Sequence, residues 1–167
     1  MNKIPLLIII LAVISACSTP KPEATTTTPI VDSTASETVS KPGSIKIHDI
    51  SRFPDIQKQN NLGKIVKELE NADCVNEKGI GFAAEYTRTY ALYERMSQLA
   101  TEPQLYSLLK NKSAVVRVYA FRALKELKYA SANEGKTILD SDTSRVCWFV
   151  GCIKTDTLVS FFSHSEE

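Results

Sequence analysis

The cysteines offer the most distinctive chemistry in this chain of 167 residues, which contains four of them. Cys147 and Cys152 are five residues apart, so they do not form the Cys-x-x-Cys motif of thioredoxin-like redox sites. That spacing places the two side chains on different faces of a regular helix or strand. A turn at Gly151 would bring them together, and Cys147 with Cys152 is the candidate disulfide that we predict. Pairing of either cysteine with Cys74 stays open.

Other residue types that commonly carry catalysis or bind metals form no recognisable motif. His48 and His164 have no His or Glu neighbour at metal-ligand spacing. Asp140, Asp142 and Asp156 lack the glycine and the final glutamate of a calcium-binding loop. There is no Gly-x-Ser-x-Gly elbow, and any Ser–His–Asp set would depend on one of the two histidines. We therefore predict a protein that is not an enzyme and uses no metal or cofactor.

The first residues combine a short basic start with an apolar run that ends at a cysteine. Met1-Asn2-Lys3 precedes eleven mostly aliphatic residues, Ile4 to Ile14, and Ser15-Ala16-Cys17 follows. The run is shorter than the ~20 residues that cross a bilayer core. Residues 1–16 resemble a bacterial lipoprotein signal peptide, and Ile14 to Cys17 resembles its lipobox. An ordinary secretory signal that is cut after Ala16 is the alternative.

The lipoprotein resemblance implies a chemical modification and a location. Cys17 would become the first residue, carrying thioether-linked diacylglycerol and a fatty acid such as palmitate on its amine, so the lipid bilayer is an expected partner. Ser18 stands where an aspartate would favour retention in the inner membrane. We therefore expect a lipid-anchored protein of the cell envelope, on the outer membrane and facing the periplasm, with surface display as an open alternative.

Residues 17–44 have the composition of a linker. Residues 18–44 include seven Thr, five Ser and four Pro, and the first aromatic residue of the chain is Phe53. Such a segment cannot bury enough apolar surface to offset its ordering entropy, so we predict disorder. A flexible chain of this length has an end-to-end distance of roughly 30 Å. The linker would hold a folded domain close to a membrane surface.

Residues 45–167 have the length of one domain, and their apolar spacing predicts helices. The expected helices cover 61–72, 82–99, 101–109 and 114–128, and Thr101 is expected to cap the third. Phe82, Tyr86, Tyr90 and Tyr93 recur on one face of the second helix, which is more typical of a core than of a binding groove.

Residues 109–124 resemble a HEAT-like repeat, in which a short helix ends in leucine and a polar turn leads to a second helix. The residues that match the order of such repeats are Val116, Arg117, Ala120, Ala123 and Leu124. HEAT-like repeats usually carry an aspartate in the turn, where this chain has Asn111 and Ser113. The resemblance implies a mostly α fold of short stacked helical hairpins, a fragment of a HEAT-like α-solenoid.

A fainter copy of this pattern begins 30 residues later, where Leu139 aligns with Leu109 and Val146 with Val116. The segment 144–153 is rich in β-branched and aromatic residues, so a short strand near 145–150 is as well supported as a helix. Thr155 or Asp156 is expected to cap a last helix that runs through Phe162.

The net charge of +1 gives no general attraction to nucleic acid, which we do not expect as a partner. One local excess of positive charge stands out, and the candidate interaction residues are Arg117, Arg122, Lys125 and Lys128. This stretch is either a solvated helix face or a docking surface. We expect the domain to bind another envelope protein. The alternatives are an enzyme or enzyme accessory that acts on cell-wall or glycan material, and a structural spacer.

Overall fold

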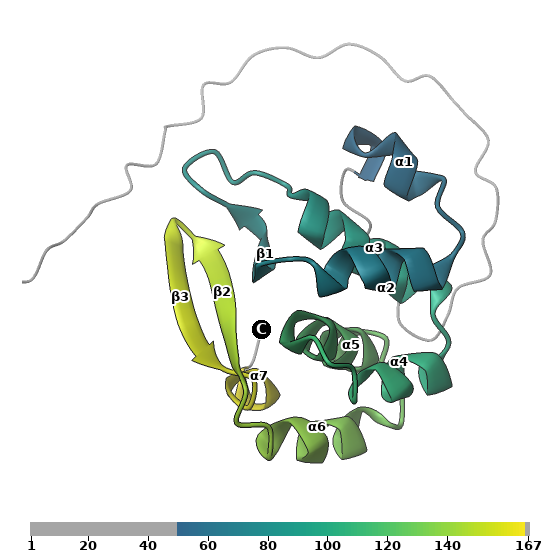
Figure 1. Cartoon of the computed structure of the whole chain (residues 1–167), viewed down its shortest axis with the longest axis vertical. Coiled ribbons are helices and arrows are strands. Elements are labelled where there is room, and N and C mark those ends of the chain that lie inside the picture. Colours follow the sequence, from purple (N-terminus) through teal and green to yellow (C-terminus); the bar gives the residue numbers. More distant parts are fainter. Residues whose placement is uncertain (1–49, 166–167) are drawn as a thin grey trace, which may run out of the picture. The chain divides into compact units, whose positions relative to one another are not determined.

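The computed structural model describes residues 50–165 and shows helices together with one small sheet (Figure 1). The predicted signal peptide (1–16), the linker (17–44) and His48 lie outside the described residues. The helical elements are η1 (Ile50–Arg52), α1 (Pro54–Gln57), α2 (Leu62–Glu70), α3 (Arg88–Leu99), α4 (Glu102–Leu108), α5 (Ala114–Glu126), α6 (Ala132–Asp140) and α7 (Phe161–His164). The strands are β1 (Cys74–Ile80), β2 (Arg145–Gly151) and β3 (Ile153–Leu158).

Side-chain caps set the starts of three helices. Asn61 accepts a hydrogen bond from the Lys64 amide at α2, and Thr87 accepts one from the Tyr90 amide at α3. Thr101 and Gln104 form a capping box at α4, which confirms Thr101 as the predicted cap. These contacts satisfy amides that have no partner inside the helix. Helices α2, α4 and α5 begin within about a residue of their expected positions.

Helix α5 forms the centre of the core. It contacts α2, α3, α4, α6 and the strands β1 and β2 (Figure 1). Val116, Ala120, Ala123 and Leu124 on this helix are wholly buried. Gly135 lets α6 approach closely, because a Cβ at that position would come within 3.1 Å of Leu109 Cδ1. The predicted buried face of α5 is therefore confirmed.

The sheet has the strand order β1-β2-β3. β1 pairs with β2 in parallel, and β2 pairs with β3 in an antiparallel hairpin. Helices α3 to α6 lie between β1 and β2 in the sequence and supply the long crossover that a parallel pair requires. The strand near 145–150, one of the two alternatives from the sequence, is confirmed. The fold is therefore mostly helical with a small mixed sheet, and helices alone do not account for it.

The predicted helix over 82–99 begins only at Arg88, so its first six residues were predicted wrongly. Gly81 adopts a positive φ of 71°, and the backbones of Ile80 and Glu85 form a β-bridge around the turn. Phe82 is 83% exposed at this turn, whereas Tyr86, Tyr90 and Tyr93 are buried. The tyrosines belong to the core, as expected, and Phe82 does not.

The predicted last helix from residue 155 was also wrong over its first half, because 153–158 is strand β3. Thr155 pairs with Trp148 and Thr157 pairs with Val146 across the hairpin. The hairpin turns at Gly151, whose φ is 53°. The fainter second helical hairpin therefore does not form, since β2 occupies the place of its second helix. Only Phe161–His164 is helical.

The disulfide joins Cys74 to Cys147, so the predicted pairing of Cys147 with Cys152 was wrong. Cys74 and Cys147 are direct partners in the parallel register of β1 and β2, with Cα atoms 4.4 Å apart. Adjacent strands bring these residues within disulfide distance although 73 residues separate them. Cys152 lies exposed just beyond Gly151, outside this disulfide.

Candidate interaction surface

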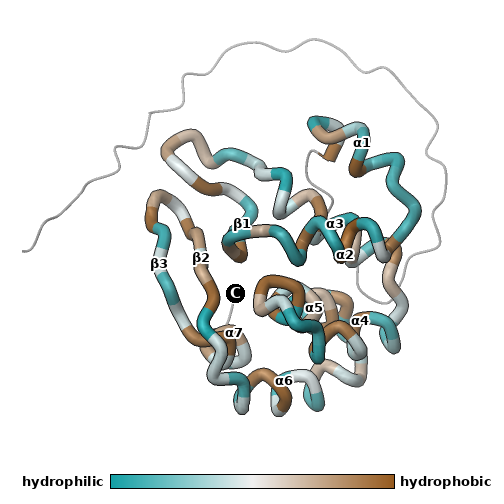
Figure 2. Tube along the Cα trace, viewed as in Figure 1, coloured by the Kyte–Doolittle hydropathy of each residue, from teal (hydrophilic) through white to brown (hydrophobic). Residues whose placement is uncertain are grey.

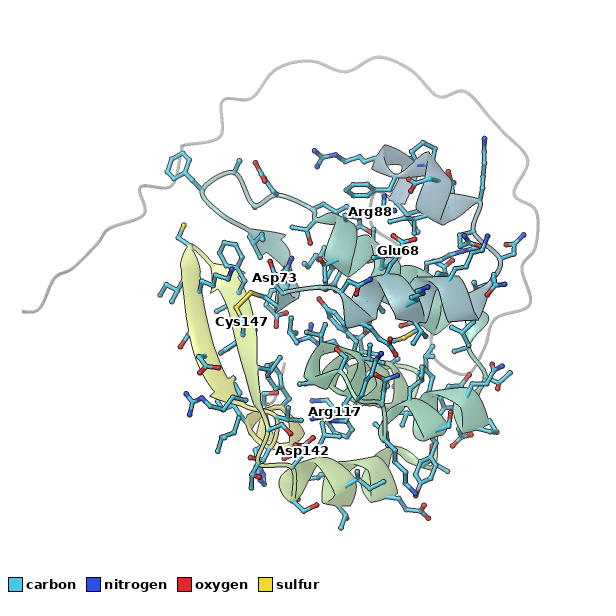
Figure 3. All side chains as sticks on the ribbon, viewed as in Figure 1. Glu68, Asp73, Arg88, Arg117, Asp142 and Cys147 are labelled. Atoms are coloured by element: carbon cyan, nitrogen blue, oxygen red, sulfur yellow. A yellow bond between two sulfur atoms is a disulfide. The ribbon has the colours of Figure 1, made fainter. Side chains whose placement is uncertain are left out.

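Arg117 is held inside the fold, which removes it from the predicted docking stretch. Its Nε lies 2.7 Å from Asp142 Oδ2, and Nη1 donates to the carbonyls of Asn111 and Lys112. Figure 3 shows Arg117 and Asp142 pointing toward one another between α5 and the end of α6. The arginine thus connects the turn before α5 with the turn before β2, and it is not available to a partner.

Arg122 is buried as well, and its position depends on strand β1. Its Nη2 lies 2.6 Å from Glu77 Oε1, which also accepts a hydrogen bond of 2.8 Å from Trp148 Nε1. The guanidinium carbon lies 6.0 Å from the centre of the Tyr93 ring, within cation–π range. Arg122 therefore links α5 to both strands of the parallel pair, and its inclusion in the docking stretch was wrong.

Lys125 and Lys128 are the two predicted interaction residues that remain exposed. Lys125 Nζ donates a 2.7 Å hydrogen bond to the carbonyl of Ser165, just after α7. Lys128 follows the end of α5 with a φ of 55°, the left-handed conformation that closes a helix. Burial and pairing therefore reduce the basic stretch from four residues to these two.

The end of β3 and the start of α7 present apolar side chains to solvent. Leu158 is 40% exposed and Phe161 is 43% exposed. The Phe161 ring lies 5.2 Å from the Trp148 ring and 5.6 Å from the Phe162 ring, so packed aromatic neighbours support it. We call Leu158 and Phe161, which lie at the end of β3 and the start of α7, the β3–α7 patch. The sequence predicted a last helix through Leu158 and Phe161 and gave no indication that these two side chains are exposed.

The structure brings Ser163, His164 and Asp140 together, the residue types of a catalytic triad. Asp140 Oδ1 accepts a hydrogen bond from Ser163 Oγ and lies 3.0 Å from His164 Nε2. In a triad the histidine contacts the serine directly and takes its proton. Here the carboxylate binds both side chains, and Ser163 Oγ also donates to the Ser160 carbonyl. The arrangement joins α7 to α6 and does not activate a nucleophile.

A surface recess of about 300 Å³ lies between α2 and α3, with Arg88 at its edge. The guanidinium lies 2.7 Å from Asp55 Oδ2 and 2.7 Å from Glu68 Oε2. Figure 3 shows Arg88 and Glu68 close together. These hydrogen bonds lower the pKa of Asp55 below its usual range. Two carboxylates already neutralise the arginine, so the recess is not suited to an anion.

A buried polar cluster supports the core below the sheet. Tyr86 Oη donates to Glu94 Oε2 at 2.6 Å, and the Tyr93 and Tyr119 rings stack at 4.8 Å. Tyr119 Oη bridges the amide and the carbonyl of Asn76 on β1. Burial raises the pKa of both Tyr93 and Tyr119, so they act as neutral hydroxyls. These contacts hold α3, α5 and β1 together and leave no space for a ligand.

Comparison of the chain with protein-family models, curated proteins and solved structures finds no match. Over residues 50–165, no group of three or more His, Cys, Asp or Glu side chains could hold a metal ion. No helix within that range is long and apolar enough to cross a membrane. The β3–α7 patch is therefore the site whose exposure and chemistry carry a functional argument.

Proposed function

We propose that this chain is a lipid-anchored envelope protein whose C-terminal domain, predicted over residues 45–167, binds another protein of the envelope. Acylated Cys17 would hold it on the periplasmic side of the outer membrane. The sequence supports the anchor through the apolar run and the Ser15-Ala16-Cys17 motif. The β3–α7 patch supports the binding role.

The observation that carries the binding role is the exposure of Leu158 and Phe161, of which Phe161 packs against Trp148 and Phe162. Aromatic and aliphatic side chains that are held in place dominate the binding energy of protein interfaces. Within the described residues, β3 pairs with β2 on one side only, so its other edge can accept a strand of a partner. Lys125 donates to the Ser165 carbonyl just after α7, and its positive charge would favour a partner with an acidic rim.

We also propose that α4 and α5 correspond to a single HEAT-like helical hairpin. The two helices pack against each other and are joined by the polar turn that includes Asn111. Arg117 reaches Asp142, which lies one structural unit further along the chain. Such a contact is similar to the arginine–aspartate pairing between neighbouring HEAT-like units, although the aspartate here comes from the following turn.

Photo-crosslinking in intact cells tests the binding role. A photoreactive phenylalanine at Leu158 or Phe161 should give one discrete crosslinked protein, whereas the same probe at exposed Lys136 on α6 should not. Phe161→Asp should remove the product formed from position 158, because a buried charge in an apolar contact is unfavourable. Equal crosslinking from positions 158 and 136, or a product that Phe161→Asp leaves unchanged, would contradict the proposal.

A further inference from the structure

Two uncharged turns lie side by side at the opposite end of the sheet from the β3–α7 patch. The first turn is Gly81-Phe82-Ala83-Ala84 and the second is Gly151-Cys152-Ile153. The Gly81 amide donates a 2.6 Å hydrogen bond to the Gly151 carbonyl, which joins them. We call these seven residues the apolar turn pair. Figure 2 shows apolar colouring at both turns, beyond the ends of β1 and β2.

The apolar turn pair presents its two large side chains to solvent. Phe82 is 83% exposed and Ile153 is 67% exposed, the two highest values among the exposed large hydrophobic residues of the described chain. The backbone beneath them is fixed, since Glu85 donates to the Ile80 carbonyl at 2.7 Å and Ala84 donates to the Gly81 carbonyl at 3.2 Å. A fixed turn exposes these side chains persistently, so water contacts them unless a partner covers them.

The shape and the surrounding charges of the turn pair favour a lipid surface over a protein pocket. Turns at the end of a sheet project outward, and the residues of the turn pair line neither the recess between α2 and α3 nor the one beside Arg122 and Lys125. Lys78, Lys154 and Glu85 lie exposed next to the turns, two cations and one anion. Lysines beside an apolar tip can extend their ammonium groups to lipid phosphates while the tip enters the acyl region.

The predicted anchor supplies the second argument for lipid. The predicted linker, with an expected reach of roughly 30 Å, would keep the domain beside the bilayer, so even a weak contact would be made at high effective concentration. We infer that the apolar turn pair inserts Phe82 and Ile153 into the surface of the bilayer to which Cys17 is anchored, an inference that rests on the proposed lipid anchor.

This orientation would leave the proposed binding site accessible. Strand β3 runs from Ile153 in the turn pair to Leu158 in the β3–α7 patch. Five steps along a strand cover roughly 16 Å. With the turn pair in the bilayer, the β3–α7 patch would stand away from the lipid surface, where a second protein can reach it.

Tryptophan fluorescence tests the inference, because Trp148 is the only tryptophan in the chain. The full-length acylated protein with Trp148→Phe and Phe82→Trp is placed in vesicles of phosphatidylethanolamine and phosphatidylglycerol with brominated acyl chains. Interfacial segments lie about 5–10 Å below the headgroups, so bromine should quench this emission by about half or more. The matched control carries Trp148→Phe and Tyr106→Trp on α4, and its emission should not change.

Two further measurements distinguish a failure to insert from a failure to fold or to attach. Circular dichroism confirms that both variants fold, and vesicle flotation reports whether the acylated protein is attached. Attached protein in which Phe82→Trp is quenched no more than Tyr106→Trp would overturn the inference and leave the proposed function intact. Acylated protein that fails to float would overturn the inference together with the proposed anchor.

Discussion

Glu77 is the residue on which the contact between α5 and the parallel strands most depends. One oxygen of its carboxylate, Oε1, is within hydrogen-bond distance of both Arg122 Nη2 and Trp148 Nε1. The Arg122 side chain is 10% exposed and that of Glu77 is 24% exposed, so solvent cannot readily replace this contact. Removing one member of a buried charge pair costs more than the pair contributes, since the remaining charge keeps its desolvation penalty.

Glu77→Ala is therefore expected to lower the free energy of unfolding by about 3 kcal/mol, the scale for breaking a buried ion pair. Glu77→Gln should cost less, because its amide oxygen can still accept from Trp148. Urea denaturation measures both values, with Lys154→Ala at an exposed position on β3 as the control. If Glu77→Ala matched Lys154→Ala, Glu77 would not connect the helix to the strands.

Lys128 provides a second test at a single residue, because its backbone conformation favours glycine. Its φ is 55°, and the Tyr129 amide donates to the Leu124 carbonyl in the pattern that closes a helix with a left-handed residue. Lys128→Gly should raise the free energy of unfolding by about 1 kcal/mol by relieving this conformation. Lys128→Ala removes the same charge but keeps the Cβ, and should give no gain. If the free energy of unfolding rises equally in both variants, the loss of the lysine charge explains the gain and the backbone conformation does not.

At the scale of elements, the disulfide joins β1 to β2 across a separation of 73 residues. Cross-linking distant parts of a chain stabilises the fold mainly by restricting the unfolded state. Peptide mapping without reduction should recover Cys74 linked to Cys147. Replacing both by alanine should cost roughly 2–4 kcal/mol, whereas Cys152→Ser should change stability by no more than about 0.5 kcal/mol. A recovered Cys147–Cys152 peptide would contradict the strand pairing.

The contact between Arg117 and Asp142 joins α5 to the turn before β2 and makes stability depend on pH. Burial raises the pKa of Asp142, but hydrogen bonds from Arg117 and Ser144 outweigh it and leave the pKa below the usual 3.8. The charged carboxylate is thus favoured in the folded state. Its contribution is fully present above the unfolded pKa and is lost as the pH falls through the lower folded pKa.

Asp142→Asn should consequently unfold at a lower urea concentration than the native chain at pH 7. The difference should narrow below about pH 4, where the native carboxylate becomes protonated. Asp73→Asn, at an exposed position, serves as the matched control and should follow the native chain throughout. If the difference in urea midpoint between Asp142→Asn and the native chain stays constant down to pH 2, Asp142 stabilises the fold through its shape and not through its charge.

Elements that depend on local signals could be predicted from the sequence. Helices α2, α4 and α5 show both apolar periodicity and polar residues at their starts, and they form where expected. Strand β1 was missed because its conformation depends on β2, which follows it by about 70 residues. β3 was assigned to a helix because Thr155 and Asp156 can also act as caps, and the antiparallel pairing with β2 decides otherwise.

The candidate surface could be predicted only in part for a related reason. Lys125 and Lys128 were identified by charge alone, but so were Arg117 and Arg122, whose acidic partners lie on other elements. Exposure of Leu158 and Phe161 follows from the edge position of β3, which no local pattern determines. The polar run Lys154-Thr155-Asp156-Thr157, with its two β-branched threonines, was the one signal that could have suggested an exposed strand.

At the scale of the whole molecule, the proposed function depends on the anchor at Cys17. In the proposed arrangement, acyl chains would hold the domain at the bilayer, the turn pair would orient it, and the β3–α7 patch would then face a partner. Phe82 and Ile153 alone expose too little apolar surface for lasting attachment, so the orientation requires the anchor. Without acylation at Cys17, both the location and the orientation lose their basis.

Labelling of growing cells with radioactive palmitate tests this claim most directly. The native protein and Cys152→Ser should incorporate label and stay with membranes after a high-salt wash. Cys17→Ser should incorporate none and should be released, because two or more acyl chains give stable attachment that this variant lacks. A Cys17→Ser protein that remains with washed membranes, or a native protein without label, would contradict the account.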